Sequence, residues 1–244
     1  MTPNCKLALL ILALTLDGQV HTGKIIHGNK VAPHQRPYMV FVENHKHGQS
    51  KTSCSGFLLD ESFVMTAAHC HAHSHTVIMG SHRISENAEV MNVEKAFPHP
   101  GFNITDCSDD LLLLKLSCKA TFSKNVGPID LATDNGGSLP QSCSVSGWGS
   151  TSQNNGYASR VLMEANVTII ESDKCQKAKS YCSEGETGPA SGDSGGPLVC
   201  EDGKAYGVVS STKTTTDGQL IKSYVKISDY RSWIDMIMNN TGKP

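Results

Sequence analysis

The sequence predicts an all-β fold, either a barrel or a sandwich, with a single helix at the carboxyl end. Short apolar and β-branched segments are separated by Gly, Pro, Asn and Ser, without an internal repeat or a low-complexity tract. Only near the carboxyl end does the apolar period change to that of a helix. The 244 residues are 38% hydrophobic and 18% charged, which excludes a disordered, collagen-like or coiled-coil chain.

Seven segments have the length and composition of strands bounded by turn residues. They are residues 38–43, 63–66, 89–97, 111–116, 142–147, 161–170 and 205–211. Many short strands at this spacing are typical of a barrel or a sandwich. The polar stretch at residues 119–140 is broken by Gly and Pro, and it is the best candidate for a crossover between two halves.

The last segment predicts an amphipathic helix. Its apolar residues recur at i, i+3, i+4 and i+7: Tyr230, Trp233, Ile234 and Ile237. Ser228 or Asp229 is placed to cap its first turn. We therefore expect a C-terminal helix that packs its apolar face on the core.

The only long apolar run lies near the amino terminus, at residues 7–16. Lys6 precedes it and small and polar residues follow, a pattern that predicts a secretory signal peptide over residues 1–18. The run is too short to span a bilayer, so we expect no membrane span. Residues 19–24 then form an activation propeptide, and the mature domain, residues 25–244, begins at Ile25. We expect the protein to be secreted or stored in a secretory granule.

The charges nearly balance, with 21 Lys and Arg against 23 Asp and Glu, and there is no basic run. Such a chain neutralises few phosphates, so we expect no nucleic-acid partner. Removing Cys5 with the signal peptide leaves eight of the nine cysteines, an even number that suits a disulfide framework outside the cytosol. Their order alone leaves about 105 pairings open.

Two short motifs carry the chemistry: Thr-Ala-Ala-His-Cys at residues 66–70 and Gly-Asp-Ser-Gly-Gly-Pro at residues 192–197. They resemble the His and Ser motifs of chymotrypsin-like serine proteases. Residues 25–28, 110–116 and 147–149 match further family motifs in the same order, so the resemblance covers residues 25–238. It implies the trypsin-like serine protease fold: two six-stranded antiparallel β-barrels with a C-terminal α-helix. The loop at residues 33–39 is similar to that of the granzyme and mast-cell protease branch.

Three residues are the candidate catalytic triad. A serine hydroxyl becomes a useful nucleophile only when an imidazole takes its proton, and a carboxylate must hold that imidazole in the right tautomer. We assign Ser194 as the nucleophile, His69 as the general base and then acid, and Asp110 as the carboxylate. Asp109 is the rival acid, but only Asp110 directly abuts the buried-strand pattern, as the family motif requires. No metal or cofactor is expected.

The backbone N–H groups of Gly192 and Ser194 are the candidate oxyanion hole, because glycines here allow a tight turn. The resemblance implies how the site is activated. Cleavage after Lys24 by a trypsin-like protease frees the α-amino group of Ile25, which inserts and pairs with Asp193.

The resemblance also implies three disulfides, which pair Cys54 with Cys70, Cys143 with Cys200, and Cys175 with Cys182. Cys107 and Cys118 have no partner in the family. They flank a six-residue strand about 20 Å long, at about 3.3 Å per residue, well beyond the roughly 7 Å limit between bridged Cα atoms. We expect two free thiols.

The specificity pocket departs from most relatives. Its base, six residues before the nucleophile, is Gly188, so no carboxylate is available to bind Arg or Lys. Lys222 falls where most relatives have glycine and granzyme B has arginine, which predicts cleavage after Asp or Glu. Two loops that frame the pocket, between Cys175 and Cys182 and between Cys182 and Gly188, are shorter than in most relatives. The other interpretation is that these shortened loops leave Lys222 in solvent, with a preference for small or apolar residues. The strand that begins at Ser210 pairs with substrate in the family, and Thr212 replaces a glycine there and crowds the pocket mouth.

Three histidines alternate at His71, His73 and His75. They would either lie on one strand face and bind zinc or lie in a solvated loop, and we favour the loop. Asn103, Asn166 and Asn239 each stand in an Asn-x-Thr frame, so we expect glycosylation there.

The mature chain keeps ten of the eleven histidines. Since histidine titrates near pH 6.5, an acidic granule would make the protein net positive and favour binding to a proteoglycan. Serpin-type inhibitors are further expected partners.

The function predicted is a serine endopeptidase that cleaves proteins or peptides. The alternative is a catalytically impaired homologue that acts as a secreted binding protein, which Thr212 and the shortened loops would favour.

Overall fold

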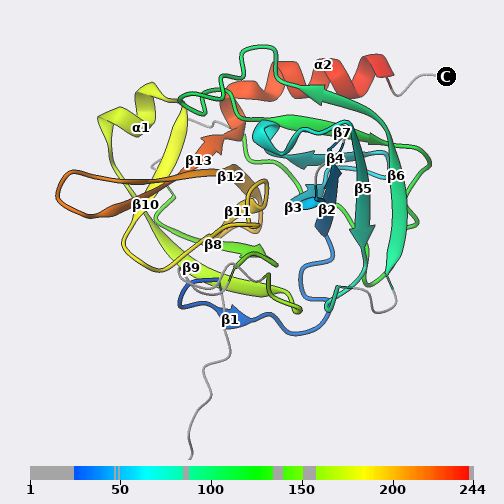
Figure 1. The fold of residues 1–244 in the computed structure, drawn as a ribbon, viewed down its shortest axis with the longest axis horizontal. Helices are drawn as coiled ribbons and strands as arrows, with labels where there is room; N and C mark the ends of the chain where they lie inside the picture. The colour runs from blue at the N-terminus through cyan, green and yellow to red at the C-terminus, as the bar shows by residue number, and fades with distance from the viewer. Residues whose placement is uncertain are drawn as a thin grey trace, which may run out of the picture.

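In the computed structural model, the described residues are 25–46, 48, 50–84, 88–133, 140–150 and 158–241. The predicted signal peptide and propeptide lie outside them. Two β-barrels stand side by side, and the C-terminal helix runs along one edge of the molecule (Figure 1).

The first barrel closes in the strand order β2, β3, β4, β7, β6, β5. Its strands are β2 (Met39–His45), β3 (Thr52–Leu58), β4 (Phe63–Thr66), β5 (Ser74–Met79), β6 (Glu89–Pro98) and β7 (Leu112–Leu116). Every pair is antiparallel. Leu112, Leu113 and Leu114 are all fully buried, so β7 is covered on both faces. A short-range alternation of apolar and polar residues is therefore absent from this strand.

The second barrel contains six antiparallel strands in the order β8, β9, β10, β13, β12, β11, and β11 pairs back with β8. They are β8 (Ser142–Gly147), β9 (Met163–Ile170), β10 (Ser180–Glu184), β11 (Pro197–Cys200), β12 (Ala205–Thr214) and β13 (Leu220–Lys226). The two-residue strand β1 (Asn29–Lys30) adds to the outer side of β9. The prediction of two six-stranded barrels is confirmed.

The C-terminal helix α2 spans Arg231–Thr241, and a 3₁₀ turn, η2 (Ile227–Tyr230), leads into it. Tyr230 and Ile234 are buried, as their spacing predicts. The predicted cap was wrong, because Ser228 and Asp229 lie inside η2 and not before the α-helix. Two further short elements are η1 (Ala68–Cys70) and α1 (Asp173–Lys177). No helix among the described residues is long and apolar enough to cross a membrane.

Three disulfides join the pairs that the resemblance implies: Cys54–Cys70, Cys143–Cys200 and Cys175–Cys182. The first ties β3 to η1, the second links neighbouring strands β11 and β8, and the third ties α1 to β10. Cys107 and Cys118 are free thiols. Between β7 and β8 the chain passes from one barrel to the other, and its described part forms no helix or strand.

Candidate active site

The pairing of β4 with β7 brings His69 and Asp110 together. Thr66 at the end of β4 opposes Leu112 at the start of β7, so the η1 turn after β4 lies beside the residues before β7. His69 Nδ1 lies 2.7 Å from Asp110 Oδ2, and the His69 backbone N–H donates to Oδ1 at 2.8 Å. Asp110 is fully buried. The carboxylate therefore binds His69 through its backbone N–H and through Nδ1 of its ring, and leaves Nε2 on the opposite side of the ring.

A third donor reaches the same carboxylate from the second barrel. Ser210 Oγ, on β12, donates to Asp110 Oδ2 at 2.6 Å. The sequence suggested only a substrate-pairing role for this segment, and no local pattern predicts a contact across 100 positions. Ser210 thus connects the two barrels at the site.

Asp109 faces away from His69. Its Oδ1 accepts a hydrogen bond from the Tyr230 hydroxyl at 2.6 Å, and its Oδ2 lies 3.9 Å from His99 Nδ1. Burial and this carboxylate raise the pKa of Tyr230. The geometry selects Asp110 over its neighbour as the partner of the imidazole.

Ser194 lies on a turn pressed against the end of β4. Its carbonyl accepts from the Ser55 N–H at 2.9 Å, and the next N–H, of Gly195, donates to Val209 on β12 at 2.8 Å. Gly195 has φ of +84°, and any side chain there would overlap the Thr66 hydroxyl and the Ser55 carbonyl. Glycine is therefore required for this close approach, which brings Ser194 to the segment that leads into His69.

The N–H groups of Gly192 and Ser194 donate to no protein acceptor within the described ranges. Gly192 has φ of +95°, and its carbonyl accepts a hydrogen bond from Ser55 Oγ at 3.2 Å. Two unused donors beside a serine are what the stabilisation of a developing oxyanion requires. Sequence reasoning missed the contribution of Ser55, which no motif marks.

Asp193 is buried between these residues. Its Oδ1 accepts from the Gly149 N–H at 2.8 Å and its Oδ2 from the Ala190 N–H at 2.9 Å. Burial raises the pKa of its carboxyl to about 7, although both hydrogen bonds act to lower it. Ile25 is also fully buried, and Ile26 pairs with Gly188. The start of the predicted mature chain thus lies inside the second barrel.

Lys222 is only 1% exposed, which rules out the solvent-facing interpretation of this side chain. It lies on β13 opposite Thr212 of β12. A Cβ atom on Gly188 would lie 3.0 Å from Lys222 Cδ, so the lysine stem packs against the predicted pocket base. Its Nζ donates to the Gly185 carbonyl. Burial lowers the pKa of Lys222, and the Glu186 carboxylate partly offsets this.

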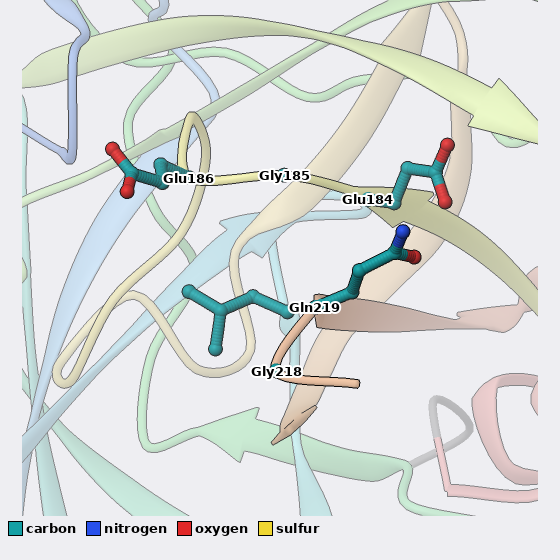
Figure 2. A pocket seen from close by; sticks show the side chains of 6 residues that line it. Glu184, Gly185, Glu186, Gly218 and Gln219 are labelled. Carbon is teal, nitrogen blue, oxygen red and sulfur yellow. The ribbon is translucent and has the colours of Figure 1, made fainter. Parts of the chain in front are cut away.

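A hollow of about 470 Å³ lies beside the Gly185 carbonyl. It is lined by Glu184, Gly185, Glu186, Gly218, Gln219 and Leu220. Figure 2 shows the two glutamates on opposite sides of it, with their carboxylates pointing away from each other. Thr212 is exposed on the neighbouring strand.

A larger groove of about 720 Å³ is lined by the loop before β7, by α1 and by β12. Cys107 and Ser108 line it on one side, Ser211 and Lys213 on another, and α1 supplies Lys174 among others. Ser108 and Ser211 are close in sequence to Asp110 and Ser210, although none of His69, Asp110 and Ser194 lines the groove. An extended peptide bound there would lie along β12.

The sequence favoured a solvated loop for the three alternating histidines, and this prediction was wrong for His75. His71 and His73 are exposed, but His75 lies on β5 and is 4% exposed. Among the described residues, the group of closely spaced potential metal ligands is Cys54, His69 and Cys70. Its two cysteines form a disulfide and are not available as thiolates.

The three candidate glycosylation residues, Asn103, Asn166 and Asn239, are all exposed. They lie in the loop before β7, on β9 and on α2.

Two closed barrels with this site at their junction define the class of protein, a serine endopeptidase with the trypsin-like fold. The Trypsin family model matches residues 25–234, and the chain belongs to this family.

Within the family it belongs to the granzyme branch. It is 39% identical to granzyme E of Mus musculus, covering 94% of this chain and 97% of that protein. It is 37% identical to granzyme B of Rattus norvegicus over 97% of this chain and all of that protein. The solved structure titled "Structure of GrC" is 35% identical, covers 88% of this chain and all of its own, and has a TM-score of 0.77.

Proposed function

We propose that this endopeptidase hydrolyses peptide bonds through Ser194, His69 and Asp110. The observation that carries the proposal is the 2.7 Å contact between His69 Nδ1 and the buried Asp110 carboxylate. It keeps the proton of the imidazole on Nδ1 and leaves the Nε2 lone pair for the serine hydroxyl.

In the first step His69 Nε2 takes the Ser194 proton while Oγ bonds to the scissile carbonyl carbon. The carbonyl oxygen becomes an oxyanion and accepts from the N–H groups of Gly192 and Ser194. The imidazolium then protonates the leaving amine as the C–N bond breaks. A water molecule repeats the sequence on the acyl-enzyme, which releases the acid and restores Ser194.

Covalent labelling tests this assignment against the binding-protein alternative. After cleavage at Lys24, a fluorophosphonate should label the wild type and fail to label Ser194→Ala. The alternative predicts no label on either protein.

We further propose that the enzyme prefers Asp or Glu before the scissile bond. Lys222 is buried with its stem against Gly188, and its Nζ donates to the neutral Gly185 carbonyl. The Glu186 carboxylate favours the charged form of this side chain but only partly offsets the effect of burial on its pKa. A substrate carboxylate entering the pocket would add the counter-charge that the buried cation still needs.

Lys222→Gly should lower kcat/KM for substrates with Asp or Glu at this position by about 10- to 100-fold, the value of one charge-assisted hydrogen bond. A peptide library gives the profile, and fluorophosphonate labelling of Ser194 should be unchanged. Lys204→Gly, on the exposed β11–β12 turn, is the matched control and should leave the preference intact. Wild-type cleavage chiefly after Phe, Leu or Ala would disprove the pocket assignment.

We propose that the protein is made as a secreted zymogen. Residues 1–18 are removed as a signal peptide, and a trypsin-like protease then cuts after Lys24. Serpin-type inhibitors would present their reactive loops to the groove beside β12.

Secretion predicts glycosylation at Asn103, Asn166 and Asn239, whose exposure leaves each accessible to the transferase. Peptide N-glycosidase should increase the gel mobility of the secreted protein. Each single Asn→Gln variant should lose the part of this shift that one glycan causes. Unchanged mobility of the wild type would exclude all three sites.

Storage in an acidic granule would add positive charge through histidine. His75 does not contribute, because burial and the nearby His71 and His45 lower its pKa to about 4. Burial also lowers the pKa of His99. The positive charge that the chain gains below the ordinary histidine pKa of about 6.5 should make binding to an anionic proteoglycan stronger at pH 5.5 than at pH 7.4. Heparin-column elution at the two pH values measures this, and equal retention would contradict it.

A further inference from the structure

Two imidazoles meet just after the η1 turn. His71 follows η1, and His75 lies on β5, which pairs with β2 in the first barrel (Figure 1). His71 Nδ1 and His75 Nε2 are 3.4 Å apart, and the two rings are stacked with their centroids 5.6 Å apart. The pair consists of two of the three alternating histidines that the sequence suggested, His71 and His75.

A buried asparagine fixes the tautomer of His75. Asn44 opposes His75 in the β2–β5 register and is 1% exposed. Its Nδ2 donates to Cys54 Sγ at 3.4 Å, which turns Oδ1 toward His75 Nδ1 at 3.0 Å. Because Oδ1 only accepts, the proton of His75 lies on Nδ1.

The lone pair of His75 therefore lies on Nε2, on the side of His71. The Ala72 N–H donates to the same Nε2 at 3.3 Å, in agreement with that tautomer. Burial and two neighbouring histidines keep this imidazole neutral above about pH 4. A neutral imidazole whose other nitrogen is held by an oxygen is how metal-binding histidines are commonly supported.

We propose that His71 Nδ1 and His75 Nε2 bind a divalent transition metal such as Zn²⁺. Tetrahedral zinc with Zn–N bonds of 2.0–2.1 Å places two ligand nitrogens about 3.4 Å apart, which is the separation between these atoms. On binding, the His71 proton is exchanged through water from Nδ1 to Nε2, which frees the Nδ1 lone pair for the metal. The Nε2 lone pair of His75 exchanges the Ala72 N–H for the metal, and that N–H is left to water. Water fills the other two positions. Imidazole ligands select zinc, copper or nickel over magnesium or calcium.

The site differs from the catalytic histidine, whose Nδ1 already bonds Asp110. It lies two residues further along the chain, and the Cys54–Cys70 disulfide joins the Asn44 side of the site to the catalytic turn.

Isothermal titration with zinc at pH 7.4 tests the proposal on the untagged mature protein. We expect one zinc per chain in the wild type, and Co²⁺ should give the visible absorption of a tetrahedral complex. His71→Ala should weaken binding at least tenfold. Because His71 is exposed, the variant should fold as the wild type does, which thermal unfolding checks.

His73→Ala, an exposed histidine in the same loop, is the matched control and should bind as the wild type does. His69→Ala should also bind zinc, although it is inactive. The proposal is overturned if the wild type binds no zinc, if His71→Ala binds normally, or if affinity is lost in His69→Ala or His73→Ala instead.

Discussion

Replacing Asp110 by Asn should lower the kcat of the activated enzyme about 10⁴-fold, the loss that the same replacement causes in a related protease. The asparagine amide presents an N–H to His69 Nδ1, so the ring places its own proton on Nε2. That nitrogen then cannot accept the Ser194 proton. Steady-state cleavage of a peptide substrate measures the loss.

Asp109→Asn is the matched control. Its oxygen can still accept from the Tyr230 hydroxyl, and it does not contact His69 in the structure. We therefore expect nearly unchanged turnover. A large loss in Asp109→Asn together with normal turnover in Asp110→Asn would reverse the assignment of the triad.

The uncleaved precursor should lose stability as the pH rises from 5 to 8. The pKa of Asp193 is about 7 in the folded protein, well above its ordinary value of 3.8. Between these values the folded state holds a proton that the unfolded state has lost, so the free energy of unfolding falls by about 1.4 kcal/mol per pH unit. Between pH 5 and 8 the loss is about 3 kcal/mol, and it is complete above pH 7.

Urea unfolding of the precursor measures this slope, with Ser194→Ala in the background to prevent self-cleavage. Asp193→Asn should remove it, because an amide does not titrate. The difference between the two proteins cancels other groups, His75 among them. Equal slopes would show that the Asp193 carboxyl is not the cause.

Cleavage after Lys24 should remove the pH-dependent loss of stability that Asp193 causes, and it should activate the enzyme. The freed ammonium of Ile25 supplies the cation that Asp193 lacks among the described residues, and it orders the loop that carries Gly192. Asp193→Asn should be cut at Lys24 and remain inactive. Full activity of the uncleaved wild type would refute this mechanism.

Local sequence predicted strands best where residues are apolar. The bounds of β4 and β8 match the predicted segments, and β12 extends three residues beyond its segment. Strands β3, β5, β10, β11 and β13 were not among the predicted segments. In β5 and β13, His75 and Lys222 interrupt the apolar pattern. Closure of each barrel buries these positions whatever their polarity.

The candidate site was also predicted only in part: residues within a motif were found, and residues on distant strands were not. Motifs predicted His69, Asp110 and Ser194 as the candidate triad because short segments carry them. The side chains that support them come from distant strands. Ser210 reaches Asp110 across 100 positions, and Lys222 meets Gly185 across 37. Such contacts depend on strand order and register, which no local pattern encodes.

Alkylation of the free thiol of Cys107 should report whether a peptide occupies the groove. Cys107 lines the groove, and burial and the Asp110 charge raise its pKa, so it reacts slowly with alkylating reagents at neutral pH. A peptide lying in the groove would cover it further. Cys118 is exposed and does not line the groove, so its alkylation provides an internal reference within the same molecule. The ratio of Cys107 alkylation to Cys118 alkylation should therefore fall as peptide occupies the groove, and the measurement needs no engineered residue.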